Sequence, residues 1–472
     1  MIGRETEVKV LERAAASPKS EFVAVYGRRR IGKTYLIRKT FGPRLLFAHA
    51  GVENVGLDGQ LRAFRSSLRD AGGNPRTRIG SWFDAFDALK DLIRSSSAPK
   101  KILFLDELPW MDTPKSNFVP ALEFFWNGWA SARDDILLVV CGSATSWIVS
   151  HVLKARGGLH NRVSEQLRLR PFTLDECARY ASELGLELSR QDLAEAYMAL
   201  GGVAWYWSLL RPGASLARNI DALFFGPDAK LGLEYSRLYA SLFKNPEPYM
   251  RVVEALGERG RGLLRAELEK ICGLPESGKI SKILEELEQC GFVRRYRPFG
   301  ACKKGSLVQL LDAFTLFHFR FVKSNVNDDP AFWSSSFGKP AHGAWAGLAF
   351  ERVCLLHQEQ IRRALGISGV ANGICSWRAG PKDGRPGAQI DLVIDRDDRI
   401  VNLCEMKWCE TPYEVDSGEA ERLRNRREAF IRETGTRKAV HLTLVTPWGL
   451  KQNMHAGVFQ SVVTFDDLFH DA

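Results

Sequence analysis

The sequence predicts an α/β protein in which a parallel-sheet core is followed by a helical lid, a winged-helix domain and a C-terminal α/β domain. Apolar runs alternate with helical spacing near the N-terminus, short helices precede a hairpin pattern in the middle, and strands return near the end. A length of 472 residues also fits about three domains, at roughly 100 to 200 residues each. These observations exclude a single small fold.

Five continuous β-prone runs mark the strands of the first domain, residues 1–172. They are residues 21–27, 44–50, 101–107, 135–143 and 165–172. Segments with apolar residues at helical spacing separate the first four runs. Continuous apolar strands are typical of a parallel sheet covered by helices on both faces. We therefore expect a βαβ series.

A glycine-rich loop lies between the first apolar run and the helix after it. Gly27-Arg28-Arg29-Arg30-Ile31-Gly32-Lys33-Thr34 fits G-x-x-x-x-G-K-[ST] in the strand-to-helix context that this pattern requires. The glycines allow the backbone to wrap around phosphate oxygens, and the helix N-terminus presents free N–H groups. We expect Lys33 to reach the β and γ phosphates and Thr34 to hold Mg²⁺. The loop predicts a nucleotide-binding core with ATP or GTP and Mg²⁺ as cofactors.

Two carboxylates follow the third apolar run. Asp106 ends the run ILFL, where a carboxylate can organise Mg²⁺, and Glu107 comes next, where a glutamate can polarise the attacking water. The pair predicts a hydrolase rather than a passive binder. The alternative is an ordinary acidic strand end.

The spacing pattern of apolar residues changes twice in the middle of the chain. Residues 173–240 return to helical spacing without a strand pattern, as expected of a helical lid. Residues 241–325 show three short helical segments and then a two-stranded hairpin, which is the pattern of a winged helix. Asn, Asp, Ser and Pro residues before 341 mark a linker.

The expected winged helix carries basic residues in two places. Lys279 and Lys282 lie near the start of its third helix, and the hairpin carries Arg294, Arg295, Arg297, Lys303 and Lys304. A recognition helix can enter the major groove of DNA by its N-terminal end while the wing neutralises phosphates. The alternative is an interaction or autoinhibitory module with a solvated basic hairpin.

The last domain, residues 341–472, places acidic residues on successive elements. Asp391 ends one strand pattern, Glu405 and Lys407 lie on the next, and Glu351 lies on the opening helix. This layout resembles the PD-(D/E)XK nuclease fold, an α/β restriction-endonuclease-like domain. The resemblance implies that Asp391, Glu405 and Glu351 bind Mg²⁺ and that Lys407 orients or activates the attacking water, with Gln389 beside it. The alternative is a surface salt bridge on an inactive copy of the fold.

Several motifs together resemble one family across essentially the whole chain. They are YGRRRIGKTYLI, LFLDELPW, VVCGSATSWI, RPFTLDE, GGVAWYW and EMKW. The sequence is similar to archaeal and bacterial AAA-like P-loop ATPases that carry a winged helix and a C-terminal PD-(D/E)XK nuclease-like domain. Two departures are Ala204 after the Gly pair and Ala313 after Asp312, where the family usually has Pro. Both concern turn geometry and leave the ATP chemistry untouched.

The resemblance adds two candidate residues to the nucleotide site. Ser143 ends the fourth strand run, beside the γ-phosphate if the strands are ordered as in AAA-type ATPases, and it would sense or position water there. Arg162 precedes the fifth run, where such ATPases often present an arginine finger to a neighbouring subunit. An arginine finger that acts on a neighbouring subunit implies a homo-oligomer. The alternative for Arg162 is a solvated surface arginine.

Net charge and composition limit the classes of partner that we expect. A net charge of +10 makes a polyanion plausible, so DNA is the expected partner. No apolar run is long enough to cross a bilayer and the N-terminus is too charged for a secretory signal, so we expect a cytoplasmic protein without a membrane partner. The nine Cys residues include no C-x-x-C pair and are interpreted as reduced thiols.

Three functions remain open at this point. The first is an ATPase that acts on DNA through a nuclease domain controlled by the nucleotide state. The second is an ATP-gated regulatory or interaction switch, STAND-like, with a C-terminal domain that is a non-cleaving scaffold. The third is a transcription regulator that hydrolyses ATP and binds DNA without cutting it.

Overall fold

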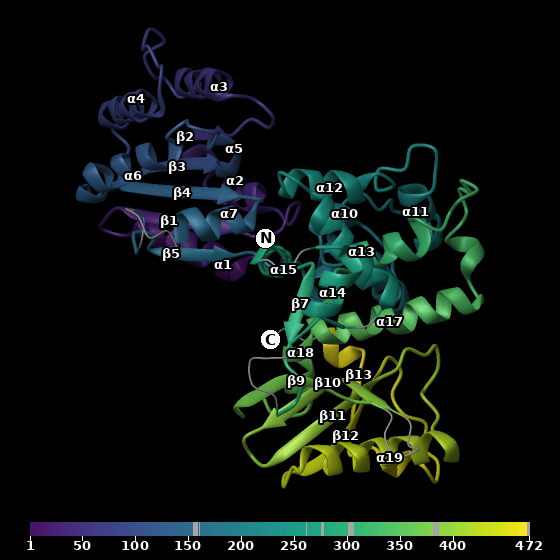
Figure 1. The fold of residues 1–472 in the computed structure, drawn as a ribbon. Helices are drawn as coiled ribbons and strands as arrows, with labels where there is room; N and C mark the ends of the chain where they lie inside the picture. Colours follow the sequence, from purple (N-terminus) through teal and green to yellow (C-terminus); the bar gives the residue numbers. More distant parts are fainter. Residues whose placement is uncertain are drawn as a thin grey trace. The chain divides into compact units, whose positions relative to one another are not determined.

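The computed structural model describes residues 1–153, 159, 161–260, 262–274, 278–300, 306–380 and 387–469 (Figure 1). The chain forms two compact units. Unit 1 holds Met1–Pro171 and Ser241–Lys244, and unit 2 holds Phe172–Ala240 and Asn245–Ala472.

Unit 1 is built on a five-stranded parallel sheet in the order β2-β3-β4-β1-β5. The strands are β1 Glu21–Tyr26, β2 Leu45–Ala50, β3 Lys101–Asp106, β4 Ile136–Gly142 and β5 Glu165–Arg168. The five runs in the sequence therefore become five strands, and the parallel sheet is confirmed. Every residue of β3 and β4 is buried, which explains why these runs are continuously apolar.

Helices cover both faces of this sheet (Figure 1). They are α1 Glu5–Ala16, α2 Lys33–Phe41, α3 Leu57–Asp70, α4 Trp82–Ser95, α5 Leu108–Met111, α6 Phe118–Gly128 and α7 Thr145–Ile148. Alternate strand residues face opposite layers, because Phe22 packs with α3, α4 and α6 whereas Val23 packs with α1 and α2. The sheet thereby presents the carboxyl ends of its strands at one edge, where polar residues gather.

Unit 2 begins with helices. They are α8 Leu174–Glu183, α9 Arg190–Leu200, α10 Ala204–Trp207, α11 Leu216–Phe224 and α12 Glu234–Leu242. Thr173 and Ser189 start α8 and α9 with capping boxes, so local sequence sets these helix starts. Ala204 and Ala313 are the first residues of short helices, positions at which proline is favoured but not required.

A small helical and antiparallel module follows. It contains α13 Glu247–Arg259, β6 Leu263–Leu264, α14 Arg265–Cys272, α15 Gly278–Gln289, β7 Val293–Tyr296 and β8 Leu307–Leu310. The three strands pair in the order β6-β8-β7, all antiparallel. The expected hairpin is present as β7 and β8, and β6 is a third strand that the sequence did not indicate.

The segment expected as a linker is anchored in the fold. It follows α16 Ala313–Phe317 and a π-helix, His318–Val322, and precedes α17 Pro340–Leu356. Trp333 is fully buried in this segment and packs on Phe317, Phe321 and Trp345. Its polar composition reflects exposed flanks around one apolar anchor.

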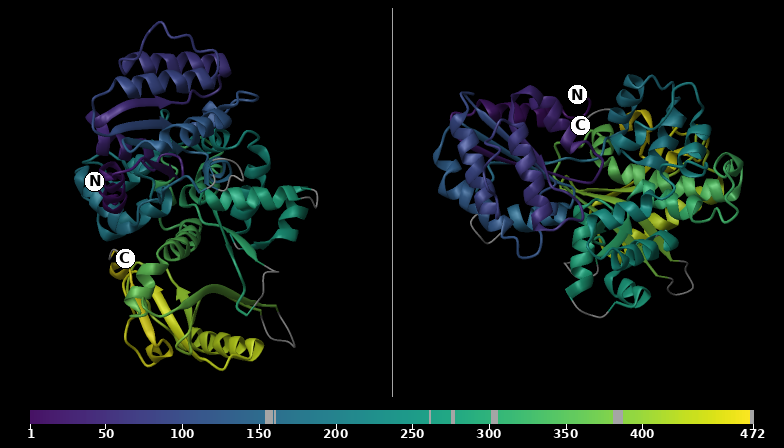
Figure 2. Two further views of the ribbon diagram at one scale, coloured as in Figure 1. Left: turned by 90° about the vertical axis from the view of Figure 1, so that its left-hand side faces the viewer. Right: turned by 90° about the horizontal axis from the view of Figure 1, so that it is seen from above.

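The C-terminal part holds a mixed sheet in the order β13-β12-β11-β10-β9. Its elements are α18 Gln358–Ala364, β9 Asn372–Ala379, β10 Ala388–Arg396, β11 Ile400–Met406, α19 Ser417–Thr434, β12 Ala439–Thr446 and β13 Ser461–Thr464. Strands β9 to β11 are antiparallel, whereas β11 to β13 are parallel. Helix α19 lies along one face (Figure 2), where Leu423 and Phe430 join the buried cluster.

None of the helices in the described ranges is long and apolar enough to span a membrane.

Candidate nucleotide site and C-terminal carboxylates

The glycine-rich loop needs both of its glycines. Gly27 has φ +146°, and a Cβ there would lie 2.4 Å from the carbonyl oxygen of Leu169. Gly32 has φ +92° and precedes the first residue of α2. Other residues rarely adopt these backbone angles, so the two glycines allow the tight path that brings N–H groups to a phosphate.

Lys33 points its ammonium group back into the loop. Its Nζ donates to the carbonyl oxygens of Gly27 at 2.9 Å and Arg28 at 2.8 Å, and to Ser143 Oγ at 3.1 Å. The side chain is buried. A buried cation at the start of a helix makes this part of unit 1 suited to an anion.

Asp106 and Thr34 form a pair of oxygen donors. The Thr34 hydroxyl donates to Asp106 Oδ2 at 2.6 Å, while Asp106 Oδ1 accepts from the Glu107 N–H at 2.9 Å. Cys141 Sγ also donates to Oδ1, at 2.8 Å. Burial and the nearby Asp106 carboxylate raise the pKa of the Cys141 thiol well above its usual range, so it remains a neutral donor.

Glu107 has a left-handed backbone conformation at the turn between β3 and α5. Its φ is +50° and it precedes α5, which turns its carboxylate toward the end of β4. The Ser143 N–H donates to Oε2 at 3.0 Å and the Ser143 hydroxyl donates to Oε1 at 2.6 Å. Ser143 therefore connects the Lys33 ammonium and the Glu107 carboxylate.

These residues fit Mg²⁺ with a nucleotide. Among the residues that the structure describes, no group of three or more His, Cys, Asp and Glu side chains is arranged to hold a metal. Mg²⁺ commonly takes only one or two protein ligands and completes its shell with substrate phosphates and water. The Thr34 hydroxyl and the Asp106 carboxylate are suitable ligands of this kind.

The remaining predicted residues of unit 1 lie at or near the loop, with one exception. Arg28 and Ile31 are buried, while Arg29 and Arg30 are partly exposed. Arg162 is exposed in the turn before β5, where its backbone N–H donates to Leu159 O at 3.0 Å. The structure of one chain therefore leaves Arg162 available at the surface.

In unit 2, Glu405 and Lys407 meet at the end of β11. Lys407 Nζ lies 3.0 Å from Glu405 Oε1 and 3.7 Å from Glu419 on α19. Arg426 of α19 also pairs with Glu405. Glu419 and Arg426 were not among the predicted site residues, because the sequence does not show which of the many charged residues of α19 face β11.

Asp391 lies on the neighbouring strand. Gln389 Nε2 donates to its Oδ1 at 2.7 Å, so these two residues are together as expected. The pairing of β10 with β9 is irregular between Ile390 and Val393, a bulge that redirects the strand beside Asp391.

Glu351 of α17 is the third expected carboxylate. Burial raises its pKa to about 7; Arg352 opposes this shift, and the Asp391 and Glu405 carboxylates add to it. Arg352 lies 3.0 Å from Glu351. Asp391 and Glu405 are thus close enough to influence Glu351, but the three carboxylates form no metal-binding cluster within the described ranges.

Arg294 is engaged inside unit 2. Its Nε donates to Gln309 Oε1 at 2.9 Å, its Nη2 donates to the Asp391 carbonyl oxygen at 3.3 Å, and its guanidinium lies 4.3 Å from the centre of the Tyr296 ring. Burial lowers its pKa to about 10. The structure therefore places Arg294 next to the C-terminal carboxylates rather than on an open basic hairpin.

The other basic residues expected to contact DNA in the small module that the structure describes are Lys279, Lys282, Arg295 and Arg297, and all are exposed. Arg295 pairs with Glu288, and Lys282 Nζ lies 4.0 Å from Glu286. Lys303 and Lys304 lie outside the described residues.

The end of β7 continues into the C-terminal sheet. Pro298 bridges Ser376 in parallel, and the Phe299 N–H donates to the Ser376 carbonyl oxygen at 2.7 Å. The Phe299 ring packs on Phe430 of α19, whereas Tyr296 is buried at the hairpin. The small module and the C-terminal sheet are therefore joined by backbone hydrogen bonds.

Comparisons with known proteins find similarity over the first part of the chain and over longer stretches of it. Residues 1–210 match the family model described as an ATPase domain predominantly from Archaea. A Walker-type ATPase of Pyrococcus abyssi superposes with a TM-score of 0.50 at 15% identity, covering 68% of this chain and 96% of that chain. This structural likeness shows the fold.

Two further matches cover different shares of this chain. An uncharacterized protein of Methanocaldococcus jannaschii is 23% identical over 412 residues, which are 86% of this chain and 87% of the relative. The ORC2 protein of Aeropyrum pernix, in complexes with ADPNP and ADP, matches with a TM-score of 0.44 and 14% identity, over 68% of this chain and 93% of that chain.

Proposed function

We propose that residues 1–210 bind and hydrolyse ATP with Mg²⁺. The observation that carries this proposal is the arrangement of Lys33, Ser143 and Glu107, in which one hydroxyl group contacts both a phosphate-binding cation and a candidate general base. The match to an archaeal ATPase domain favours ATP over GTP.

Each residue of this site has a separate task. Lys33 and the loop N–H groups bind the β and γ phosphates, and Thr34 with Asp106 would hold Mg²⁺, which neutralises charge on the phosphate oxygens. Glu107 accepts a proton from, or orients, the attacking water. Ser143 holds the Glu107 carboxylate at the end of β4, so that water and phosphate meet at one edge of the sheet.

Nucleotide binding tests this assignment. Lys33→Ala should lose binding of labelled ATP, whereas Lys39→Ala, on the same helix but away from the loop, should bind as the parent does. If Lys33→Ala binds labelled ATP as tightly as the parent, the site is misassigned.

We further infer that Arg162 acts across a subunit contact as an arginine finger. Its exposure before β5 supports this role, and such a residue can contribute about 10³ to 10⁵ in rate. Mixing Arg162→Ala with Lys33→Ala subunits should partly restore turnover. A protein that is monomeric at the working concentration and turns over ATP at its full rate would contradict the idea.

A DNA-cleaving C-terminal domain is the second part of the proposal. The small module 247–310 would act as a winged helix, and Asp391, Glu405 and Glu351 would hold Mg²⁺ in a PD-(D/E)XK-like domain. The part of the rise in the Glu351 pKa that comes from Asp391 and Glu405 supports this, because a divalent cation would relieve that repulsion. Lys407 would orient the water that attacks the phosphodiester.

Cleavage assays separate this function from ATP turnover. Asp391→Ala and Lys407→Ala should each abolish Mg²⁺-dependent cleavage of labelled DNA while ATP turnover continues. Lys451→Ala, which removes an exposed lysine of the same domain, is the control. If the parent cleaves no labelled DNA form with Mg²⁺ and ATP, the alternative applies, an ATP-gated switch with a C-terminal scaffold.

A further inference from the structure

Helix α3 and the loop after it expose a row of arginines that the nucleotide site does not use. Arg62, Arg65 and Arg69 are all exposed, at positions i, i+3 and i+7 of the helix. This spacing places them within about 60° of one another around the helix axis. An adjacent side of α3, centred about 100° away around the axis, is buried through Leu61, Phe64 and Leu68.

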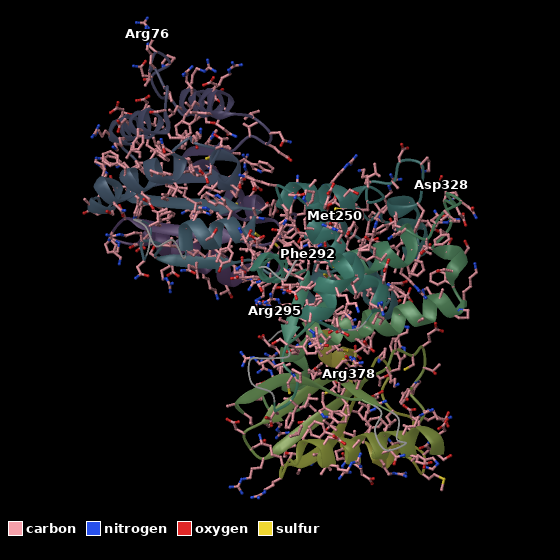
Figure 3. The ribbon with its side chains drawn as sticks, in the orientation of Figure 1. Arg76, Met250, Phe292, Arg295, Asp328 and Arg378 are labelled. Carbon is pink, nitrogen blue, oxygen red and sulfur yellow. The ribbon has the colours of Figure 1, made fainter. Side chains whose placement is uncertain are left out.

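Arg76 and Arg78 extend the same basic segment into the loop. Both are exposed, and Figure 3 shows Arg76 projecting from the tip of the loop that joins α3 to α4. The Arg76 N–H donates to Asn74 Oδ1 at 3.0 Å, and Arg65 Nη2 donates to the Ile79 carbonyl oxygen at 2.9 Å. These bonds tie the loop to itself and to the helix.

This segment carries an excess of positive charge. Residues 57–80 hold five arginines and two aspartates, a net charge of +3. Within the part of the chain that the structure describes, none of the five arginines forms an ion pair. By contrast, the neighbouring helix α4 pairs its own charges, Lys90 with Asp87 and Arg94 with Asp91.

We propose that the exposed arginines of α3 and its loop, Arg62, Arg65, Arg69, Arg76 and Arg78, form a binding surface for the phosphate backbone of duplex DNA. This surface belongs to unit 1 and shares no residue with the small module of unit 2, and the proposal does not rest on the proposed nuclease.

The geometry suits a row of phosphates. Arg62 and Arg69 are about 10 Å apart along the helix axis, at 1.5 Å per residue, which corresponds to about three phosphates of one strand at 3.4 Å each. The planar guanidinium group of one arginine can donate two hydrogen bonds to one phosphate group. Asp58 and Ser66 lie on this side of the helix beside the arginines, and neither provides an aromatic ring for stacking. The surface therefore favours the backbone of a duplex over the unstacked bases of a single strand.

A charge-matched pair of full-length variants tests this surface. Arg62→Gln/Arg65→Gln/Arg69→Gln removes the helical row. Arg13→Gln/Arg44→Gln/Arg94→Gln removes three arginines of the same unit that are already paired with Glu165, Glu12 and Asp91. Both variants change the net charge equally, and ATP turnover reports that unit 1 is folded.

The readout is the fluorescence anisotropy of a labelled 30-base-pair DNA duplex over a salt series. Each phosphate contact contributes about 0.9 to the magnitude of the slope of log affinity against log salt concentration. The α3 variant, which loses three arginines, should therefore have a slope smaller in magnitude by up to about 2.7. As a result, the ratio of the parent's DNA affinity to that of the α3 variant should fall about 40-fold when the salt concentration rises from 50 to 200 mM. The control variant should keep the parent's slope.

The proposal is overturned if the α3 variant keeps the parent's salt slope and DNA affinity. It is also overturned if the α3 and control variants lose DNA affinity equally, or if the α3 variant loses binding to labelled polyglutamate while its DNA binding is unchanged. Lys279→Gln/Lys282→Gln, measured in parallel, tests the winged helix alone, so failure of that surface is distinguishable from failure of this one.

Discussion

Ser143 links the two charged side chains on which the proposed ATP chemistry depends. Its hydroxyl donates to Glu107 and accepts from Lys33, and its N–H holds the second Glu107 oxygen. Ser143→Ala removes the hydroxyl contacts and keeps the N–H contact. A hydrogen bond to a charged group contributes about 1.5 kcal/mol, so we expect about tenfold slower turnover with little loss of ATP binding. Steady-state kinetics measures both, with Ser150→Ala as the exposed control.

His357 predicts an acid-dependent loss of stability in unit 2. Its Nε2 accepts from the Leu174 N–H at 3.0 Å and its Nδ1 donates to the Val353 carbonyl oxygen at 2.8 Å, which requires the neutral ring. Burial lowers its pKa from 6.5 to about 4. The unfolded state therefore binds the proton first, and stability falls as the pH drops below 6.5.

The size of this effect is measurable. Proton uptake by His357 in the unfolded state should lower the free energy of unfolding by about 2 kcal/mol at pH 5 relative to pH 7.5. Urea unfolding of the parent and of His357→Gln at both pH values gives the difference. If the two proteins lose stability equally between these pH values, His357 is not the titrating group.

Which residues could be predicted depends on how local their contacts are. Lys33, Thr34 and Asp106 were predictable because a short motif and a strand end determine their positions. The environment of Arg294 was not, because it arises from a contact with a strand that lies almost a hundred residues away. A basic residue in a hairpin does not show from sequence alone whether it faces solvent or a neighbouring sheet.

At the scale of elements, two neighbouring glycines allow a close contact between segments of unit 2. A Cβ on Gly202 would lie 2.0 Å from the Phe172 carbonyl oxygen, while the Phe172 N–H donates to the Gly202 carbonyl oxygen at 2.7 Å. Gly201 beside it has φ +62°. The motif GG in the sequence therefore reflects packing against the chain after β5.

Gly202→Ala should destabilise unit 2. The added methyl group must displace backbone atoms, which typically costs 1 to 3 kcal/mol or more. Gly343→Ala, in an exposed turn of α17 with nothing near the new Cβ, should instead stabilise the helix by up to about 1 kcal/mol. Thermal unfolding compares them, and equal midpoints for the two variants would contradict this account of Gly202.

The elements themselves were largely predictable. The five strands of unit 1 follow from continuous apolar runs, and capping residues indicate the starts of α8 and α9. The strand β6 was missed because two residues carry no periodic pattern. The anchored segment around Trp333 was missed because its polar flanks outweigh a single aromatic residue in any compositional estimate.

For the whole molecule, nucleotide binding predicts a shift in thermal stability. A ligand at 100 times its dissociation constant stabilises the folded state by about 2.7 kcal/mol. Mg²⁺ with ATP should therefore raise the unfolding temperature of the parent and leave that of Lys33→Ala unchanged. An equal shift in both proteins would indicate binding elsewhere.

ATP turnover by Glu107→Gln tests the central claim most directly. The substitution keeps the size of the side chain and removes the carboxylate that the Ser143 N–H and hydroxyl hold at the end of β4. We predict that Glu107→Gln binds labelled ATP as the parent does and hydrolyses it at least about 100-fold more slowly, as expected for loss of a general base. Hydrolysis within about threefold of the parent's rate would contradict the account.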